Sequence, residues 1–353
     1  MGRARADRRA GVAVALAALA AACAHEPARP GPAGTALDDA IFTAYSPLSR
    51  AEEIARRTLS PLVLAAGQRA LAAGGRALVE QQIDLSTERF SVYVPAGDPP
   101  PQGYGLLVFV APWQEASRPR RWRPPLDRHG IVFVAAAGAG NGEAILDRRL
   151  PLALLAWENV RVRWPIDPER TYVGGMSGGA RVAEAVALAY PDVFRGALLH
   201  AGSDPLGGEA GHYLPPADLF RRFQATRLVF VTGAHDEENL DADRVSRSSM
   251  HEWCVFDVAV ERPRRLAHEP LDAASLDRAL QALDRRGPVD PGERARCEAR
   301  IARELSERIG EVRAALARGD RRAARDRLEA LDARYGGLAA PSSLELAARL
   351  GPR

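Results

Sequence analysis

The stretch Gly175-Met176-Ser177-Gly178-Gly179 decides the fold, because it places a serine between glycines where a strand pattern gives way to a helix pattern. Residues 170–174 (RTYVG) are rich in β-forming side chains, and residues 180–188 (ARVAEAVAL) form an apolar helical run. Ser177 therefore lies at the turn between the two elements. Such a turn strains the serine backbone and presses strand against helix, so the positions two before and two after it tolerate little except glycine.

The helix that begins behind Ser177 supplies donors for a negative charge. Its first N–H groups lack partners within the helix, and its positive dipole end lies there, which suits a developing oxyanion. We expect the backbone N–H of Gly178 to be one donor. The second is expected from the loop at residues 111–114 (APWQ), where proline has no N–H and Trp113 or Gln114 would donate. Trp113 could equally form a pocket wall or belong to the core.

Further strand patterns flank the serine stretch on both sides. They are mostly continuous apolar runs, at residues 90–94, 105–111, 131–137, 197–202, 227–233 and 255–260, and helical patterns separate them. Continuous apolar strands that alternate with helices indicate a parallel sheet covered on both faces. The predicted fold class is therefore α/β, with a mostly parallel sheet between two layers of helices.

Two polar residues follow later strands and complete a possible catalytic set. Asp236 lies in the turn after residues 227–233, and His268 follows the last strand pattern. Both are expected at carboxyl ends of strands, where an open α/β sheet builds its sites. A serine hydroxyl is a weak nucleophile until an imidazole takes its proton, and a carboxylate fixes the imidazole tautomer. The order serine, acid, histidine predicts a triad of Ser177, Asp236 and His268.

Other residues compete for these two roles. Glu237 and Glu238 are alternatives for the acid. The alternatives for the base are His235, His251 and His200. His235 lies too close to the turn of the acid itself, whereas His251 and His200 could line the pocket without taking the proton. We therefore expect Asp236 to be the acid and His268 to be the base.

The N-terminus carries an export signal. Four arginines precede an apolar run over residues 11–22, which is too short for a stable membrane span and ends in small residues before Cys23. The pattern resembles a bacterial lipoprotein signal over residues 1–23, in which Cys23 is lipidated. An ordinary cleaved signal peptide is the alternative. Residues 24–45 read as a Pro/Gly-rich tether. By resemblance to Gram-negative lipoproteins, Ala24 indicates the periplasmic face of the outer membrane, with membrane contact only through the lipid.

After the signal and the tether, the sequence divides into two structural units. Residues 46–288 are predicted to form the α/β unit, which begins with two helices. Ser49 and Glu52 have the capping-box spacing for a helix over residues 50–59. Ser60-Pro61 predicts the start of a second helix, which reaches about residue 73. Residues 289–353 predict a helical hairpin, because apolar residues recur at helical spacing and Gly319-Asp320 interrupts them. The hairpin packs against the α/β unit or offers a docking face to another protein.

The composition indicates a globular protein and does not favour nucleic-acid or metal binding. The chain has 353 residues, of which 46% are hydrophobic and 26% charged, enough for one large core and a small satellite unit. Its net charge of +3 comes with arginines scattered among acidic residues, so nucleic-acid binding is not expected. After export, Cys254 and Cys297 would either pair as a disulfide or stay as buried thiols. No cysteine or histidine spacing predicts a metal site.

From about Phe90 to Leu283 the chain resembles exported α/β-hydrolases of the polyhydroxybutyrate-depolymerase and feruloyl-esterase type. The resemblance rests on residues 166–170 (IDPER) before the serine turn, residues 190–194 (YPDVF) after the following helix, and the later Asp turn and His loop. It implies an α/β-hydrolase fold that cleaves small or polymeric esters through an acyl-enzyme, without metal or organic cofactor. Pro112-Trp113 stands where the family has a His–Gly oxyanion loop.

Two other functions use the same fold. A serine peptidase would cleave amides with the same triad, and an idle hydrolase fold could serve as a binding protein of the cell envelope. Idle relatives usually lose a member of the triad. This chain keeps a residue for each role, so the sequence favours a serine esterase.

Overall fold

The computed structural model describes residues 34–208 and 211–351. The predicted signal segment and Cys23 lie outside these residues, as does the first part of the tether. None of the helices within the described ranges combines the length and apolar character needed to cross a bilayer.

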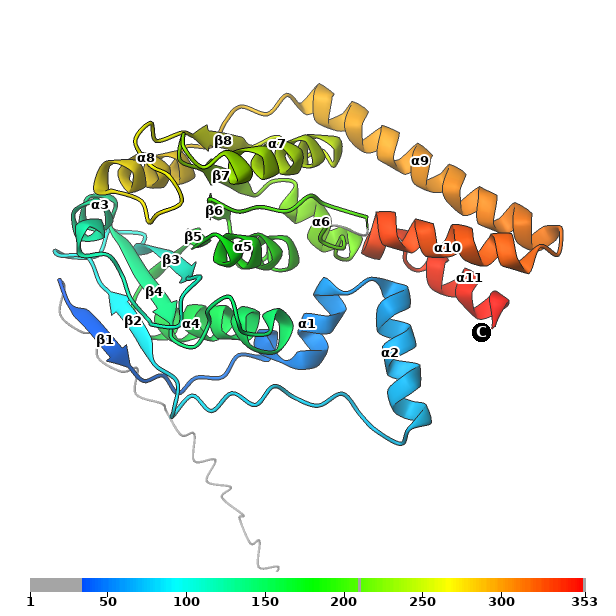
Figure 1. Cartoon of the computed structure of the whole chain (residues 1–353), viewed down its shortest axis with the longest axis horizontal. Coiled ribbons are helices and arrows are strands. Elements are labelled where there is room, and N and C mark those ends of the chain that lie inside the picture. The colour runs from blue at the N-terminus through cyan, green and yellow to red at the C-terminus, as the bar shows by residue number, and fades with distance from the viewer. Residues whose placement is uncertain (1–33, 209–210, 352–353) are drawn as a thin grey trace, which may run out of the picture.

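One eight-stranded sheet organises the molecule (Figure 1). The order across it is β1-β2-β4-β3-β5-β6-β7-β8, with β1, β2 and β4 paired antiparallel and the others parallel. The strands are β1 (Ala36–Ala40), β2 (Phe90–Tyr93), β3 (Tyr104–Val110), β4 (Ile131–Ala136), β5 (Ile166–Met176), β6 (Gly196–His200), β7 (Arg227–Val231) and β8 (Val258–Glu261). The predicted α/β class is confirmed, and the serine turn follows β5 at the middle of the sheet.

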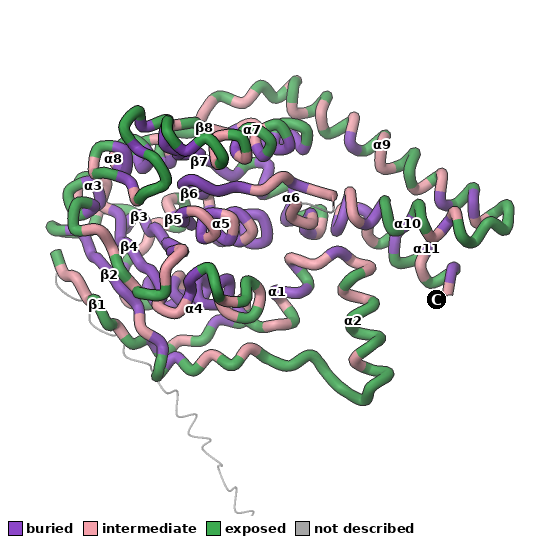
Figure 2. Tube along the Cα trace, in the orientation of Figure 1, coloured by how far each residue is buried: buried purple, intermediate pink, exposed green. Residues whose placement is uncertain are grey.

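The central strands are buried on both faces, which explains their continuous apolar sequences (Figure 2). In β3, Leu106 and Val108 pack into one core cluster, whereas Leu107 and Phe109 pack into the other. The first cluster includes residues of the helices at Ala51–Thr58 (α1), Leu150–Arg163 (α4) and Gly178–Ala189 (α5). The second includes residues of the helices at Arg123–His129 (α3) and Ala273–Asp284 (α8). The sheet is therefore a middle layer between helices.

The helices alternate with the strands as the sequence predicts. Their bounds are α1 (Ala51–Thr58), α2 (Pro61–Ala73), α3 (Arg123–His129), α4 (Leu150–Arg163), α5 (Gly178–Ala189), α6 (Ala217–Phe223), α7 (Glu237–Glu252), α8 (Ala273–Asp284), α9 (Pro291–Ala317), α10 (Arg321–Tyr335) and α11 (Ser342–Leu350). Ser60 caps α2 as predicted, since its hydroxyl accepts from Val63 N–H at 3.3 Å. Single-turn helices lie at Pro47–Ser49, Arg120–Trp122 and Gly336–Ala339, and a π-helical turn at Ile145–Arg149 leads into α4.

Two expectations at the start of the α/β unit are wrong. Residues 36–40 are not tether but the edge strand β1, because the Pro/Gly-rich composition stops at Gly34 and the following backbone pairs with β2. Ser49 does not cap α1. Its hydroxyl instead donates to the Ser46 carbonyl oxygen at 2.9 Å within the preceding turn, and Arg50 is the residue before the helix.

The C-terminal segment forms three helices where the sequence predicted a hairpin. α9 and α10 form that hairpin and break at residues 318–320, and α11 folds back on both. The three helices lie at one end of the molecule, where α10 and α11 contact α2 (Figure 1). Asp332 of α10 binds the Ser60 hydroxyl and the Leu62 N–H at the start of α2, and the rings of Trp253 and Tyr335 meet edge to face at 5.7 Å. The segment therefore packs against the α/β unit.

A disulfide also fastens this segment. Cys254, just after α7, is bonded to Cys297 in α9, 43 residues later in sequence. A cross-link over a loop of this length restricts the unfolded chain and stabilises the fold by about 2–4 kcal/mol.

We expect the double replacement of Cys254 and Cys297 by Ala to lower the free energy of unfolding by about 2–4 kcal/mol, because the unfolded chain regains the freedom that the cross-link removes. Urea unfolding followed by circular dichroism measures the change as a lower midpoint. The wild-type protein treated with a thiol reductant is the matched comparison. Equal midpoints for all three samples would show that the disulfide contributes nothing to stability.

Candidate active site

Ser177 occupies a strained turn between β5 and α5. Its φ is 56° and its ψ is −127°, a backbone region that costs a non-glycine residue about 1–3 kcal/mol. The flanking glycines are required, as the sequence predicts. A Cβ on Gly175 would lie 2.3 Å from the carbonyl carbon of Gly179, and a Cβ on Gly179 would lie 2.0 Å from the carbonyl oxygen of Val110. Close contact of β5, β3 and α5 therefore holds the serine in its strained form.

Asp236 and His268 are brought together from two loops. Asp236 follows β7 and directly precedes α7, and His268 lies between β8 and α8. His268 Nδ1 is 2.7 Å from Asp236 Oδ2. The Asp236 side chain is 7% exposed and the His268 side chain 44%, so the carboxylate is sheltered while the ring reaches the surface. With Nδ1 held by the carboxylate, Nε2 is the nitrogen left to take a proton.

The surroundings of Asp236 keep it ionised. Burial opposes the charged form, but hydrogen bonds from Asn239 and His268 outweigh burial and place the pKa of Asp236 below its usual value. Asn239 Nδ2 donates to Asp236 Oδ1 at 2.9 Å and lies 3.2 Å from His268 Nδ1. The carboxylate also lies at the positive end of α7, which favours a negative charge.

His200 connects the serine turn to the histidine loop. Its backbone carbonyl accepts the Ser177 N–H at 2.8 Å. Its ring is buried, with Nδ1 2.8 Å from the Val231 carbonyl oxygen and Nε2 2.8 Å from that of Glu269, the residue after His268. Burial lowers the pKa of His200. Because both ring nitrogens face backbone carbonyl oxygens, neither is free to take a proton from Ser177, so His200 is a positioning group and not the base.

The loop that carries two of the expected oxyanion donors begins against α5, because a Cβ on Gly179 would lie 3.1 Å from the carbonyl carbon of Ala111. Among the described residues, the backbone N–H groups of Gly178, Trp113 and Gln114 donate no hydrogen bond. The Gln114 side chain is directed elsewhere, since its Nε2 donates to Glu143 at 3.0 Å. The Trp113 ring packs against the second core cluster, and its buried indole N–H has no partner within the described structure.

Arg149 fixes the two loops that meet at the serine turn. Its buried guanidinium donates to the carbonyl oxygens of Ala139 and Ala111, at 2.8 and 3.2 Å, and to Asn141 Oδ1 at 3.3 Å. Asn141 itself lies against the turn, because a Cβ on Gly178 would be 2.4 Å from its Oδ1. The hydrogen bonds of Arg149 thus hold the loop after β3 and the loop after β4 together beside Ser177.

The competing residues lie outside this arrangement. Glu237 and Glu238 are exposed in the first turn of α7, whereas Asp236 is buried. His235 is exposed within the acid's own turn. The His251 side chain, at the far end of α7, is 71% exposed and lies 3.4 Å from Glu293 of α9. Within the described part of the chain, His268 is the histidine that pairs with a carboxylate in the turn between β7 and α7.

The hydrogen bonds of the described residues do not include one between the Ser177 hydroxyl and His268. Such contacts are often long in the absence of substrate and tighten when it binds. The structure therefore brings together Asp236 with His268, and links both to Ser177 through His200.

Sequence reasoning missed three residues of this site. Asn239 and Asn141 are short polar residues in helix and loop positions where solvent exposure is the ordinary expectation, and nothing in the local pattern marks them. Arg149 is one of many arginines in the chain. Its position between an apolar strand and an apolar helix could have indicated that Arg149 is buried. A buried charge needs several hydrogen-bond partners.

Fold and site together define the α/β-hydrolase class. The serine turn follows the fifth strand of a mostly parallel sheet, and the acid and histidine follow later strands, all at carboxyl ends.

Comparisons with known proteins agree with this class. A model of the family described as esterase PHB depolymerase matches residues 126–238, which include Ser177 and Asp236. Poly(3-hydroxyalkanoate) depolymerase C of Paucimonas lemoignei is 40% identical over 63 residues, 18% of this chain and 14% of that protein. The resemblance to esterases of the polyhydroxybutyrate-depolymerase type is thereby confirmed.

Solved structures with similar folds include a thermophilic esterase and the protein Est1E. Est2 of the planctomycete Thermogutta terrifontis has a TM-score of 0.41 at 17% identity, and the alignment covers 58% of this chain and 88% of that one. Est1E from Butyrivibrio proteoclasticus has a TM-score of 0.41 at 13% identity, with 57% and 98% covered.

Proposed function

We propose that the protein is a serine hydrolase that cleaves carboxylic esters through an acyl-enzyme. One observation carries the proposal: His268 Nδ1 contacts the Asp236 carboxylate, and His200 connects the His268 loop to the Ser177 turn. The His200 ring contacts the Glu269 carbonyl oxygen, and its backbone carbonyl accepts the Ser177 N–H. The proposal gives Ser177 the role of nucleophile, His268 that of base and Asp236 that of orienting acid. A triad needs these three roles.

In the proposed reaction the Ser177 hydroxyl attacks the ester carbonyl carbon while His268 Nε2 takes the hydroxyl proton. The carbon–oxygen bond to the alcohol then breaks, and the alcohol leaves with the proton from His268. Water attacks the resulting acyl-serine in the same way, which releases the carboxylic acid and restores Ser177. Asp236 stabilises the imidazolium that forms in each half.

The oxyanion of each tetrahedral intermediate would lie at the start of α5. The N–H of Gly178 is one donor, and the N–H of Trp113 or Gln114 is the second. Arg149 holds the carbonyl oxygen of Ala111 and thereby fixes the loop that carries the second donor. Rigid donors need no rearrangement when the negative charge develops, which is the main benefit of such a site.

The substrate class and location are part of the same proposal. The curated relative is named as a poly(3-hydroxyalkanoate) depolymerase, which supports small or polymeric aliphatic esters as substrates. The signal over residues 1–23 supports export, with Cys23 as the lipid attachment site on the periplasmic face of the outer membrane. The disulfide fits an oxidising compartment.

The test is labelling of the purified protein with a fluorophosphonate, followed by mass spectrometry of the peptides. We expect one adduct, on Ser177, because only a serine activated by a base attacks phosphorus at a useful rate. The Ser177→Ala variant should remain folded and take no label. A folded wild-type protein without label would show that the triad is idle and would favour the binding-protein function. Turnover of p-nitroanilides in preference to p-nitrophenyl esters would instead favour a peptidase.

A further inference from the structure

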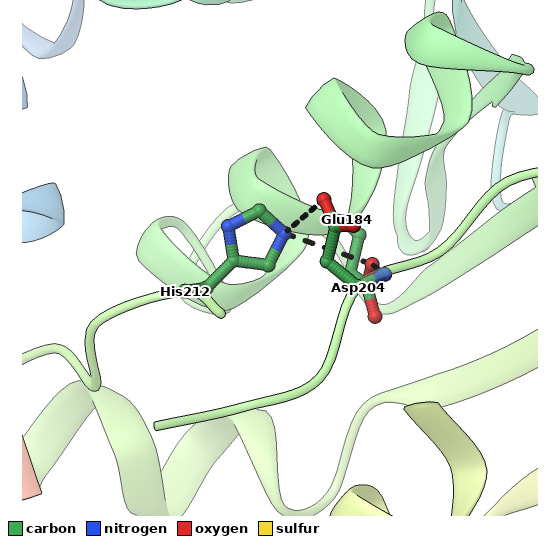
Figure 3. A group of neighbouring side chains, drawn as sticks. All are labelled: Glu184, Asp204 and His212. Carbon is green, nitrogen blue, oxygen red and sulfur yellow. Dashed lines mark hydrogen bonds and ion pairs between the residues drawn. The ribbon is translucent and has the colours of Figure 1, made fainter. Parts of the chain in front are cut away.

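A second cluster of polar side chains lies away from the proposed triad, and Figure 3 shows its three members. Glu184 comes from α5, about two turns after the serine. Asp204 lies in the loop after β6, and His212 lies further along that loop, where backbone hydrogen bonds with Pro205 and Gly207 fix its position. One possible ligand atom from each residue falls within 4.8 Å of the other two.

The three side chains face one another at distances that hydrogen bonds do not explain. His212 Nε2 is 3.6 Å from Glu184 Oε2 and 3.8 Å from Asp204 Oδ2, beyond the range of a good hydrogen bond. Nε2 is nevertheless enclosed and has no hydrogen-bond partner within the described structure. Ligand atoms about 2.1 Å from one tetrahedral cation are about 3.4 Å apart. The observed spacing is therefore close to that of ligands around a shared cation.

The outer oxygen of each carboxylate is already held by the protein. Asp204 Oδ1 binds the guanidinium of Arg181. Glu184 Oε1 lies 3.2 Å from the Ser246 hydroxyl, which is also 3.0 Å from the Asp204 carbonyl oxygen. The other oxygen of each group is directed at His212 (Figure 3). Glu184 Oε2 also accepts the Asp204 N–H at 2.7 Å, which leaves a second lone pair. Outer hydrogen bonds of this kind orient metal ligands in proteins.

Charge gives a separate reason to expect a cation. Glu184 is completely buried, and its two hydrogen-bond donors, the Ser246 hydroxyl and the Asp204 N–H, are neutral. Arg181 is paired with Asp204 and not with Glu184. A buried carboxylate without a positive partner is costly. Glu184 therefore needs a positive partner, which is either a cation bound between these side chains or the protonated ring of His212, 3.6 Å away.

We propose that Glu184, Asp204 and His212 bind one divalent transition-metal ion, for which Zn²⁺ is the best probe. One imidazole and two carboxylates suit Zn²⁺ or Mn²⁺, whereas Ca²⁺ takes six to eight oxygen ligands. The ion would join the loop after β6 to α5, the helix that begins behind Ser177. Its role is structural, since it stabilises the loop beside the proposed active site without touching the triad.

The test is titration of the full-length protein with ZnCl₂ after treatment with a chelator, read by calorimetry and by metal analysis after dialysis. We expect one Zn²⁺ per chain, and a rise in Tm of roughly 3–6 °C at a hundredfold excess over Kd. His212→Ala should weaken binding at least a hundredfold and abolish the Tm rise. His251→Ala removes an exposed histidine elsewhere and should bind Zn²⁺ as the wild type does.

Three outcomes would overturn the proposal. One is the absence of stoichiometric binding by the wild type, which would leave a protonated His212 as the partner of Glu184. Another is equal affinity in His212→Ala, which would place the ion elsewhere. The third is an unchanged affinity in Glu184→Gln, a second variant whose folding is checked by circular dichroism. None of these measurements uses ester turnover, so their failure is distinct from failure of the proposed enzyme activity.

Discussion

Replacing His268 by Ala is expected to lower kcat/KM for ester hydrolysis by about 10⁴-fold or more, while the protein stays folded. The loss is large because Ser177 would have no group to take its proton, and the hydroxyl is a poor nucleophile at neutral pH. The fold should survive because the ring is 44% exposed and lies in a loop. Steady-state kinetics with p-nitrophenyl esters measure the change, and a thermal melt checks the fold.

The matched control is His251→Ala, because it removes a second histidine that also faces an acidic side chain. We expect its kcat/KM to stay within about twofold of the wild type. Strong loss in His251→Ala together with activity in His268→Ala would exchange the two assignments. A large loss of activity in both variants would show that the loss in His268→Ala is not specific to proton transfer.

The replacement Gly179→Ala is expected to lower the free energy of unfolding by about 3 kcal/mol or more, and to abolish activity. The added methyl group would lie 2.0 Å from the carbonyl oxygen of Val110, a backbone atom that cannot move aside without separating β3 from α5. Separation of these elements would also release the strained turn of Ser177. Urea unfolding gives the stability change, and fluorophosphonate labelling reports the turn.

Gly310→Ala provides the opposite control. Gly310 lies within α9, and a Cβ there has no heavy atom within 4 Å. Replacing a helical glycine by alanine at an open position should stabilise the protein by about 0.5–1 kcal/mol, because the unfolded chain loses freedom. A Gly179→Ala variant as stable as the wild type would contradict the packing described for the serine turn. A destabilised Gly310→Ala would contradict the open surroundings described for that position in α9.

Much of the sheet could be predicted because its strands are buried on both faces and therefore read as continuous apolar runs. The edge strand β1 (Ala36–Ala40) could not, since ALDDA contains no β-branched or aromatic residue and its pairing with β2 joins distant parts of the chain. The capping prediction at Ser49 failed for a similar reason. Its spacing fits a cap, but the preceding turn offers the hydroxyl another partner.

The three predicted triad residues follow from position, because the ends of parallel strands meet at one edge. The groups that hold them do not follow from any local pattern. Asn239 acts through a contact with a carboxylate three residues earlier, and Arg149 through carbonyl oxygens ten and thirty-eight residues away. Buried polar networks depend on tertiary geometry, which hydrophobic periodicity does not encode.

The bond between Cys254 and Cys297 makes the cellular compartment part of the folding problem. α7 begins beside Asp236 and ends just before Cys254, so the same helix carries the proposed acid at one end and the cross-link at the other. A chain retained in a reducing cytosol would keep both cysteines as thiols. The proposed export would therefore also supply the oxidising compartment in which this disulfide forms. Recombinant production should accordingly direct the chain to the periplasm.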